Sequence, residues 1–339
     1  MDINPITRAI IDSTVDRGIR EIDEDPRRTI RKLTDMWRMF NRGRFLDEVF
    51  ELVQDLLRND DSPYYPAIES ILRHSDRVAL RTFGANIGYN SFTVGGRAIR
   101  ELEASKEYRI PWAVVLRINP ALQESLRVSE LESCVKQGVA MGICTYILRV
   151  EGSLACMNRL LAMVRSHPEC AFFCLLPDIP LHAEHLHAIQ ECKNISLLAR
   201  AGFPAAETNL KALRSQKSLC GIYDLYDDAG AAEWLSGRRV REISRYGCSF
   251  AAAVSEDHCS AKAAAAVAAY CRSLRMQPEY PLFVFDMTGD LQKINRVISD
   301  EEDYFELLEN GDIRTGSGLL SEFRHTTNLE KLFSIALPR

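Results

Sequence analysis

Two kinds of segment alternate along the chain beyond residue 109. Short, near-continuous apolar runs, typical of buried strands, alternate with segments whose apolar residues recur every three or four positions, as in amphipathic helices. The strand-like runs are 110–118, 143–152, 170–178, 195–202, 219–228, 248–257 and 280–287. The helical segments between them are 131–142, 155–167, 182–192, 206–216, 231–247 and 260–275. Seven strands separated by six helices predict an α/β fold with βαβ units and a parallel sheet.

Two α/β architectures fit this alternation, an open doubly wound sheet and a full or partial barrel. No G-x-G-x-x-G sequence follows the first strand, which weakens a dinucleotide-binding version of the doubly wound sheet. Periodicity by itself leaves the choice between sheet and barrel open.

The region before the first strand has a helical pattern. Apolar residues recur at helical intervals in 29–40 and 45–59, and Gly, Pro and Asp residues supply breaks at 41–44 and 59–66. We therefore expect four parts: an α-helical N-terminal region (1–80), a connecting segment (81–108), a strand–helix domain (109–290) and a C-terminal extension (291–339).

Composition narrows the class of protein. Apolar residues make up 46% and charged residues 26% of the 339 positions, which is ordinary for a soluble globular protein. The net charge of −5 and pI of about 5.9 lack the basic footprint of nucleic-acid binding. No apolar run approaches the roughly 20 residues needed to cross a bilayer, and the charged first residues lack the apolar core of a signal peptide. We expect a cytoplasmic protein that binds neither nucleic acid nor membrane.

The ten cysteines suggest packing rather than chemistry. No pair has the C-x-x-C spacing of a zinc ribbon or thioredoxin motif. Cys170 and Cys174 share one face of a strand but lie ~13 Å apart on it, too far for a disulfide or a shared metal. We therefore expect reduced thiols that pack as small apolar side chains.

The segment 80–116 resembles the stretch that precedes the cluster loop in one group of radical S-adenosylmethionine (radical SAM) proteins. The matching residues are Thr82, Phe83, Asn86, Gly88, Tyr89, Asn90, Ser91, Gly95, Ile99, Arg100, Glu101, Ile110, Pro111 and Trp112. The resemblance continues through the strand–helix units to the C-terminal region. It implies the partial (β/α)6 barrel of the radical SAM superfamily, a TIM-type barrel that follows an N-terminal α-helical region.

The chain departs from that family where the family's chemistry is carried out. The family's loop after the first strand holds a [4Fe–4S] cluster on C-x-x-x-C-x-x-C, and SAM binds the fourth iron. Here the matching loop, 117–130, has no cysteine, and serine oxygens are poor ligands for such clusters. The family's G-G-E-P motif corresponds to 150–153, where Glu151 matches the family's glutamate only with a shift of one residue and the glycine before it is lost. The family's S-V-E-G-F pattern corresponds to 199–203, where both polar side chains are lost.

The C-terminal region departs from the family in the same way. The family often has additional cysteines that flank an N-G-D turn, and this turn is present here at 310–312. Val297 and Gly316 stand at the cysteine positions. We therefore expect neither a [4Fe–4S] cluster nor SAM in this protein, and we predict no catalytic, cofactor-binding or metal-binding residue.

Charged residues at predicted strand ends are the remaining candidates for binding. Because barrel sites form at the carboxyl ends of strands, Glu151, Arg200, Asp224 and Asp286 are predicted ligand-binding residues. Arg200 would suit an anion, or it would pair with an acid such as Asp178. The acids, with neighbouring Asp227, Asp228, Glu256 and Asp257, could hold a hard cation, although solvated loop acids and helix caps are the commoner outcome.

The run 182–187 contains three histidines, which raises the possibility of a metal site. Only His182 and His185 share a helical face, and no third ligand stands at a standard spacing. His258 and Cys259 are adjacent, which does not make them a catalytic pair.

Three functions remain open. The leading hypothesis is a radical SAM pseudoenzyme, a non-catalytic binding or regulatory partner of an active enzyme, such as a radical SAM paralogue; a homo-oligomer is also possible. The alternative is a repurposed enzyme or small-molecule binder that uses Arg200 and the strand-end acids. A third hypothesis places an unusual cluster on late cysteines such as Cys144, Cys156, Cys174 and Cys220.

Overall fold

A computed structural model describes residues 5–21, 27–32, 57, 59–321 and 328–339. The predicted helices over 29–40 and 45–59 lie mostly outside these residues. Within them the N-terminal region contains helices α1 (Pro5–Glu21) and α4 (Tyr64–His74). The segment 81–108, expected as a connection, is largely helical and comprises most of α5 (Arg77–Ala85), the π-helix η1 (Asn86–Gly95) and α6 (Gly96–Glu103).

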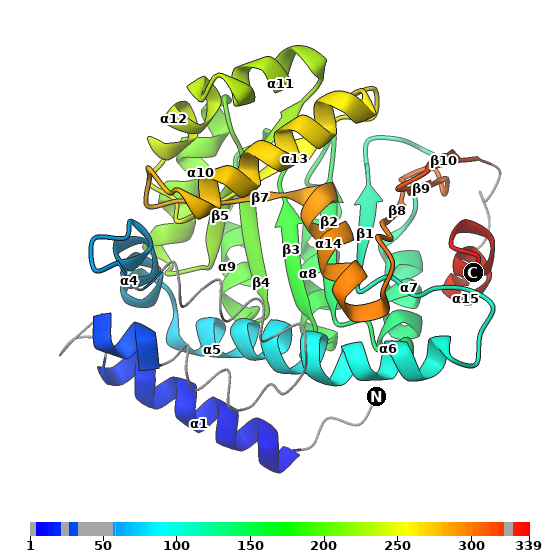
Figure 1. The fold of residues 1–339 in the computed structure, drawn as a ribbon, viewed down its shortest axis with the longest axis horizontal. Helices are drawn as coiled ribbons and strands as arrows, with labels where there is room; N and C mark the ends of the chain where they lie inside the picture. The colour runs from blue at the N-terminus through cyan, green and yellow to red at the C-terminus, as the bar shows by residue number, and fades with distance from the viewer. Residues whose placement is uncertain (1–4, 22–26, 33–56, 58, 322–327) are drawn as a thin grey trace. The chain divides into compact units, whose positions relative to one another are not determined.

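All seven predicted strands are present (Figure 1). They are β1 (Ala113–Ile118), β2 (Thr145–Val150), β3 (Ala171–Leu175), β4 (Ile195–Arg200), β5 (Cys220–Tyr226), β6 (Phe250–Ser255) and β7 (Phe283–Asp286). The helices between them are α7 (Val128–Met141), α8 (Met157–Ser166), α9 (Ala183–Glu191), α10 (Pro204–Ser215), α11 (Asp228–Leu235), α12 (Arg238–Ser244) and α13 (Ala261–Met276). The C-terminal region adds α14 (Met287–Ser299), β8 (Phe305–Leu307), β9 (Ile313–Thr315), β10 (Gly318–Leu320) and α15 (Leu329–Ala336).

The strand order decides between the two predicted architectures. It runs β10-β9-β8-β1-β2-β3-β4-β5-β6-β7, so that the strands of the repeat follow one another in chain order. A doubly wound sheet would reverse direction at a switch point, and this order contains none. The predicted fold class, α/β of the partial (β/α) barrel type, is confirmed.

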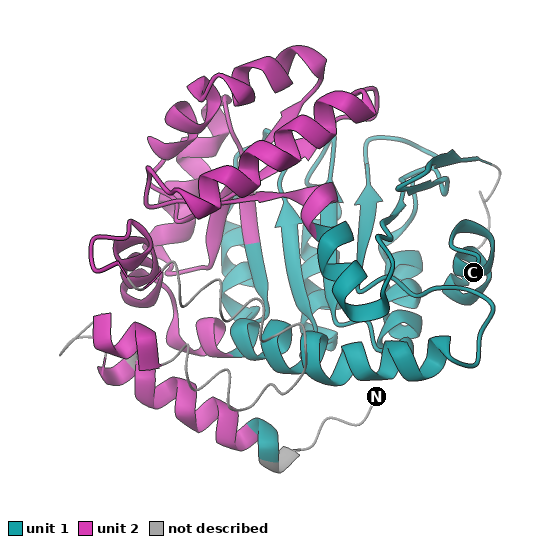
Figure 2. Cartoon of the chain, viewed as in Figure 1, with its two compact units in different colours: residues 1–8, 82–196, 291–339 teal, residues 9–81, 197–290 magenta. Residues whose placement is uncertain are grey.

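The chain divides into two compact units, drawn in different colours in Figure 2. Unit 1 comprises residues 1–8, 82–196 and 291–339, and unit 2 comprises residues 9–81 and 197–290. In unit 1, β1 pairs in parallel with β2 on one side and with β8 on the other, and β9 and β10 continue antiparallel. In unit 2, β4, β5, β6 and β7 pair in parallel in that order.

The predicted single helix over 231–247 is wrong. The chain forms two helices there, α11 and α12, and Gly237 lies between them with φ of +74°. A helix cannot continue through a left-handed residue, and glycine adopts that conformation without a steric penalty. The helical spacing of apolar residues continues across the break because both helices pack on the same core, which includes Trp234, Val240 and Ile243.

The π-helix η1 contains six of the residues on which the sequence resemblance rests. Asn86 donates two hydrogen bonds from its amide nitrogen, to the carbonyls of Pro168 (2.8 Å) and Cys170 (2.7 Å), and Asn90 donates to the carbonyl of Glu169 (2.8 Å). Both asparagines thus fix the turn that leads into β3. Two of the residues on which the resemblance rests, Asn86 and Asn90, therefore have a structural role at the amino end of β3.

Candidate functional site

Six charged side chains gather at the carboxyl ends of β1, β2 and β8 in unit 1. We call them the ionic cluster: Arg117, Arg149, Glu151, Glu306, Glu309 and Arg314. At its centre the Glu306 carboxylate is fully buried and accepts hydrogen bonds from Arg117 Nη2 (2.8 Å), Arg149 Nη1 (3.0 Å) and, at its other oxygen, Arg314 Nη1 (3.4 Å). The Tyr304 hydroxyl donates to that second oxygen at 3.1 Å.

Strand register brings the cluster together. Arg117 of β1 is directly opposite Arg149 of β2, while Glu306 of β8 is opposite Val115, two residues before Arg117. Parallel partners in register point to the same face of a sheet. The other face of β2 packs on α7, where the Tyr146 hydroxyl donates to the Val135 carbonyl at 3.1 Å. The cluster therefore lies on the face of β1 and β2 away from α7.

The outer members complete the charge balance. Glu151 Oε1 is 3.0 Å from Arg149 Nη2, and Glu309 Oε2 is 3.6 Å from Arg117 Nε. Three arginines therefore face three glutamates. Arg117 and Arg149 are 4% and 5% exposed, so that both guanidinium groups are nearly withdrawn from water. A buried charge persists only when it is paired and hydrogen-bonded, and this arrangement satisfies that condition.

The protonation of Glu306 follows from the same contacts. Burial by itself would raise the pKa of its carboxyl, but Arg149, Arg117 and Arg314 outweigh burial, and the pKa of Glu306 is lowered. The carboxylate is therefore charged at neutral pH. The three arginines and three glutamates of the ionic cluster balance in charge. The centre of the cluster is buried, while the side chains of Glu151 and Glu309 are 33% and 21% exposed.

The loop after β1 is held by its own hydrogen bonds. The backbone N–H of Asn119 donates to Ser125 Oγ at 3.0 Å, and the N–H of Leu126 donates to the Glu309 carbonyl at 2.7 Å. Ser125, the one hydroxyl in 117–128, is thus used inside the loop. The sequence resemblance assigns a [4Fe–4S] cluster to this loop. The side chains of the loop do not fit such a cluster, because none of them is a thiolate.

The ten cysteines are all free thiols. Burial raises the pKa of Cys134 to about 12 and that of Cys192 to about 11, so these two thiols hold their protons at neutral pH. Across the described residues, no group of three or more His, Cys, Asp or Glu side chains is arranged to hold a metal ion. Cys144, Cys156 and Cys174 belong to unit 1 and Cys220 belongs to unit 2.

The four predicted ligand-binding residues take up separate roles. Glu151 belongs to the ionic cluster. Arg200 ends β4, and its guanidinium carbon lies 4.5 Å from the centre of the Phe203 ring, a cation–π contact. Glu151 lies in unit 1 and the other three in unit 2.

Asp224 and Asp286 share one level of the sheet, because each is in register with Ala253 of β6. Both point to the core under α11 and α13. Trp234 Nε1 donates to Asp224 at 2.8 Å, and Arg239 pairs with the same carboxylate. Asp286 accepts from the Gly289 N–H at 2.7 Å and the Tyr226 hydroxyl at 3.3 Å, so that it caps the start of α14.

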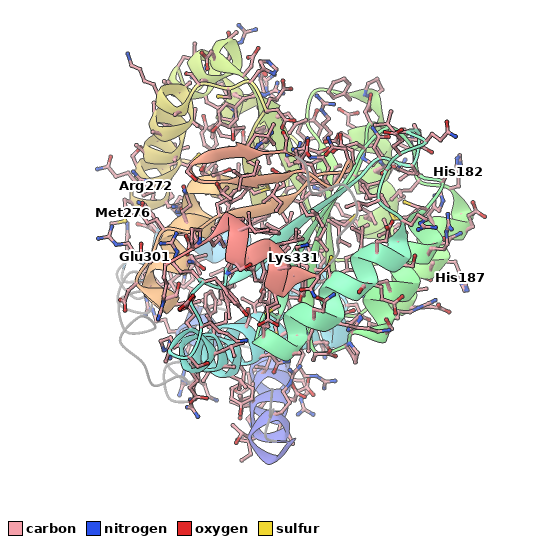
Figure 3. The ribbon with its side chains drawn as sticks, turned by 90° about the vertical axis from the view of Figure 1, so that its right-hand side faces the viewer. His182, His187, Arg272, Met276, Glu301 and Lys331 are labelled. Atoms are coloured by element: carbon pink, nitrogen blue, oxygen red, sulfur yellow. The ribbon has the colours of Figure 1, made fainter. Side chains whose placement is uncertain are left out.

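The histidine run 182–187 begins α9, and Figure 3 shows His182 and His187 projecting at separate points of that helix. His185 is buried, and its Nδ1 accepts from the His182 N–H at 3.3 Å, which caps the helix. Burial lowers the pKa of His185. The run is accounted for as a helix start.

Among the hollows of unit 2, two are neighbours and share Arg239 and Glu242. One, of about 470 Å³, lies between α10 and α12 and reaches Ala201 and Gly202 after β4. The other, of about 260 Å³, is lined by Asp224 and residues of α11 and α12. Of the four predicted ligand-binding residues, Asp224 is the one that lines either hollow.

Sequence reasoning missed Arg117, Arg149 and Glu306. A signal was present, since each is a single charge inside an otherwise apolar strand: "AVVLRI", "TYILRV" and "FEL". A charge in a strand that is buried on both faces needs a partner. Which partner it finds depends on register and strand order.

Comparison with known proteins gives distant structural similarity alone. No protein-family model matches the chain, and no curated protein matches it. Among solved structures, SuiB of Streptococcus suis bound to S-adenosylmethionine is similar over 64% of this chain and 61% of that one, at 11% identity and a TM-score of 0.44. SuiB bound to its precursor peptide SuiA gives 12% identity and the same TM-score of 0.44 over 64% and 62%.

The protein anSMEcpe with bound AdoMet is similar over 64% of this chain and 76% of that one, at 9% identity and a TM-score of 0.40. The similarity to SuiB spans less than two thirds of the SuiB chain. The fold assignment rests on the strand order of this chain itself. No helix within the described residues has the length and apolar character needed to cross a membrane.

Proposed function

We propose that this chain is a radical-SAM-type barrel that lacks the [4Fe–4S] and SAM machinery and acts as a non-catalytic binding or regulatory partner of an active enzyme. The observation that carries the proposal is the ionic cluster. It lies at the carboxyl ends of β1 and β2, the strands after which the sequence resemblance assigns the cluster loop and the SAM contacts.

The chemistry of those positions supports the proposal. An iron–sulfur cluster needs soft thiolates, and the loop after β1 has none. Glu151, at the position of the family's SAM-contacting motif, is engaged by Arg149. A ligand that entered here would have to separate charges that are already paired, at a cost of several kcal/mol. What is retained is a packed scaffold whose outer surface can bind another protein.

The first test measures iron, labile sulfide and SAM binding on one sample, purified without oxygen and subjected to cluster reconstitution. We expect no stoichiometric iron and no SAM binding by calorimetry. About four irons per chain would overturn the proposal. The variants Cys144→Ala and Cys174→Ala would then show whether those thiols hold the metal.

The second test concerns the partner. The tagged chain is co-expressed with a catalytically intact radical SAM protein from the same genome, and complex formation is measured by light scattering after size exclusion. We expect a stable complex and a change in the partner's turnover. A chain that remains alone and leaves the turnover unchanged contradicts the regulatory role.

A further inference from the structure

The hollow between α10 and α12 is lined by an excess of positive charge, although the chain as a whole is acidic. The chain carries a net charge of −5. The 470 Å³ hollow is nevertheless lined by four basic residues, Lys211, Arg214, Arg239 and Arg245, and by two acidic ones. An excess of positive charge in a concave surface of an acidic protein favours an anionic ligand.

One of these four cations is already paired with acidic side chains of the protein. Arg239 pairs with Asp224 and lies 3.1 Å from Glu242. Glu242, one of the two acids, is thereby neutralised as well. Lys211 and Arg245 are exposed, and among the described residues neither side chain forms an ion pair or a hydrogen bond. Glu207 is the one remaining acid in the lining.

Arg214 and Tyr246 are already held in place. Arg214 Nη2 donates to the Tyr246 carbonyl at 2.6 Å and to Cys248 Sγ at 3.1 Å, which fixes the guanidinium beside the hollow. The N–H of Gly202 donates to the Tyr246 hydroxyl oxygen at 3.0 Å. Because that oxygen is used as an acceptor, its own hydrogen is available to donate, and it has no acceptor within the described chain. The fixed donors need no large rearrangement to meet an anion.

Size and lining indicate what kind of anion fits. Volumes of about 300–1,000 Å³ are typical of small-molecule sites. Leu210 and Ile243 give the hollow an apolar part beside the cations. A guanidinium fork and an ammonium group are the groups that proteins use to bind phosphate oxygens. The apolar part and the Tyr246 ring would take up an organic group attached to the phosphate.

We propose that this hollow binds a small phosphate monoester, with Lys211, Arg214 and Arg245 on the phosphate and the Tyr246 hydroxyl as a neutral donor. The site lies wholly in unit 2 and includes no member of the ionic cluster. It is therefore independent of the proposed loss of iron–sulfur chemistry, and the two proposals fail separately.

The test is calorimetric titration of the full chain with adenosine 5′-monophosphate and with ribose 5-phosphate. Adenosine, ribose and inorganic phosphate serve as comparison ligands. We expect at least one phosphate ester to bind, with its phosphate-free counterpart silent and inorganic phosphate weaker. If neither ester binds at millimolar concentration, or if inorganic phosphate binds as tightly as both, the proposal is overturned.

The matched variants are Lys211→Ala with Arg245→Ala, and Arg241→Ala with Lys262→Ala as the control. Arg241 and Lys262 are exposed residues of α12 and α13 outside the lining, so both double variants remove the same charge. We expect a weakening of at least about tenfold for the first pair and less than about twofold for the control. Equal weakening in both pairs would mean general electrostatic attraction and would overturn the site.

Tyr246→Phe keeps the ring and removes the hydroxyl donor. We expect a loss of about threefold to tenfold in affinity for the ester, with the unfolding transition nearly unchanged. An unchanged affinity would remove Tyr246 from the site.

Discussion

Glu306 is the residue on which the ionic cluster depends most. Its carboxylate is the common acceptor for Arg117, Arg149 and Arg314, and it is entirely buried. Removing one charge from a buried set leaves the opposite charges without compensation, which costs more than the pair itself contributes.

We therefore expect Glu306→Gln to lower the free energy of unfolding by about 3–5 kcal/mol, measured by urea denaturation at pH 7. Glu301→Gln is the control, because Glu301 is 55% exposed and its carboxylate lies 3.7 Å from Arg109. An exposed ion pair of this kind contributes little to the free energy of unfolding. A loss of less than about 1 kcal/mol for Glu306→Gln would mean that the arginines are hydrated or re-paired.

Asp286 makes the stability of the folded protein depend on pH. Burial, together with the nearby Asp290, raises the pKa of its carboxyl from 3.8 to about 6, against the hydrogen bonds from Gly289 and Tyr226. The folded state therefore holds this proton more tightly than the unfolded state does. The resulting stability is fully present below pH 3.8 and is lost as the pH rises through about 6.

Asp286→Asn removes this titration and keeps an oxygen for the helix cap. We expect the unfolding free energy of the variant, relative to wild type, to rise between pH 4 and pH 7, by up to about 3 kcal/mol. Urea denaturation of both proteins across that range measures the difference. A difference that stays constant with pH would contradict the assigned ionisation of Asp286.

At the scale of elements, glycine placement distinguishes a helix break from a helix interior. Gly237 separates α11 from α12 in a left-handed conformation that side chains rarely adopt. Gly84 lies inside α5, and no heavy atom beyond its local backbone comes within 4 Å of a Cβ built there.

Alanine at each position should therefore have opposite effects. We expect Gly237→Ala to lower the unfolding free energy by about 1 kcal/mol and Gly84→Ala to raise it by about 0.5–1 kcal/mol. Thermal denaturation of the two variants checks the pair. Stabilisation by Gly237→Ala would mean that α11 and α12 tolerate a continuous helix.

At the scale of the whole molecule, the C-terminal residues complete the first strands. The chain returns after β7 so that β8 pairs with β1 and brings Glu306 to the two arginines. Unit 1 is therefore built from segments that lie apart in the sequence, because residues 197–290 intervene between 82–196 and 291–339.

A chain that ends at Ser299 lacks β8 to β10 and α15 and leaves Arg117 and Arg149 without Glu306. We expect this truncated chain to lose cooperative unfolding, followed by circular dichroism on heating. A cooperative transition within a few degrees of that of the full chain would contradict the structural role of the C-terminal strands.

The local pattern predicted what local physics controls. Near-continuous apolar runs marked all seven strands of the repeat, because a strand buried on both faces must be apolar. The helical period marked the intervening helices, apart from the break at Gly237. There the left-handed φ of one residue separates α11 from α12. The absence of cysteine from the loop 117–130 was also evident from the sequence, because it depends on the residues of that loop alone.

The tertiary structure decided which charges meet. Arg117 and Glu306 are 189 positions apart, and Asp224 and Asp286 face the helices rather than a shared cavity. Strand register, strand order and the return of the C-terminal segment fix these contacts, and none of them is encoded within one stretch of chain. A near-continuous apolar run indicates that a strand is buried on both faces. The partner that a charged side chain meets there depends on which distant strand the backbone hydrogen bonds align beside it.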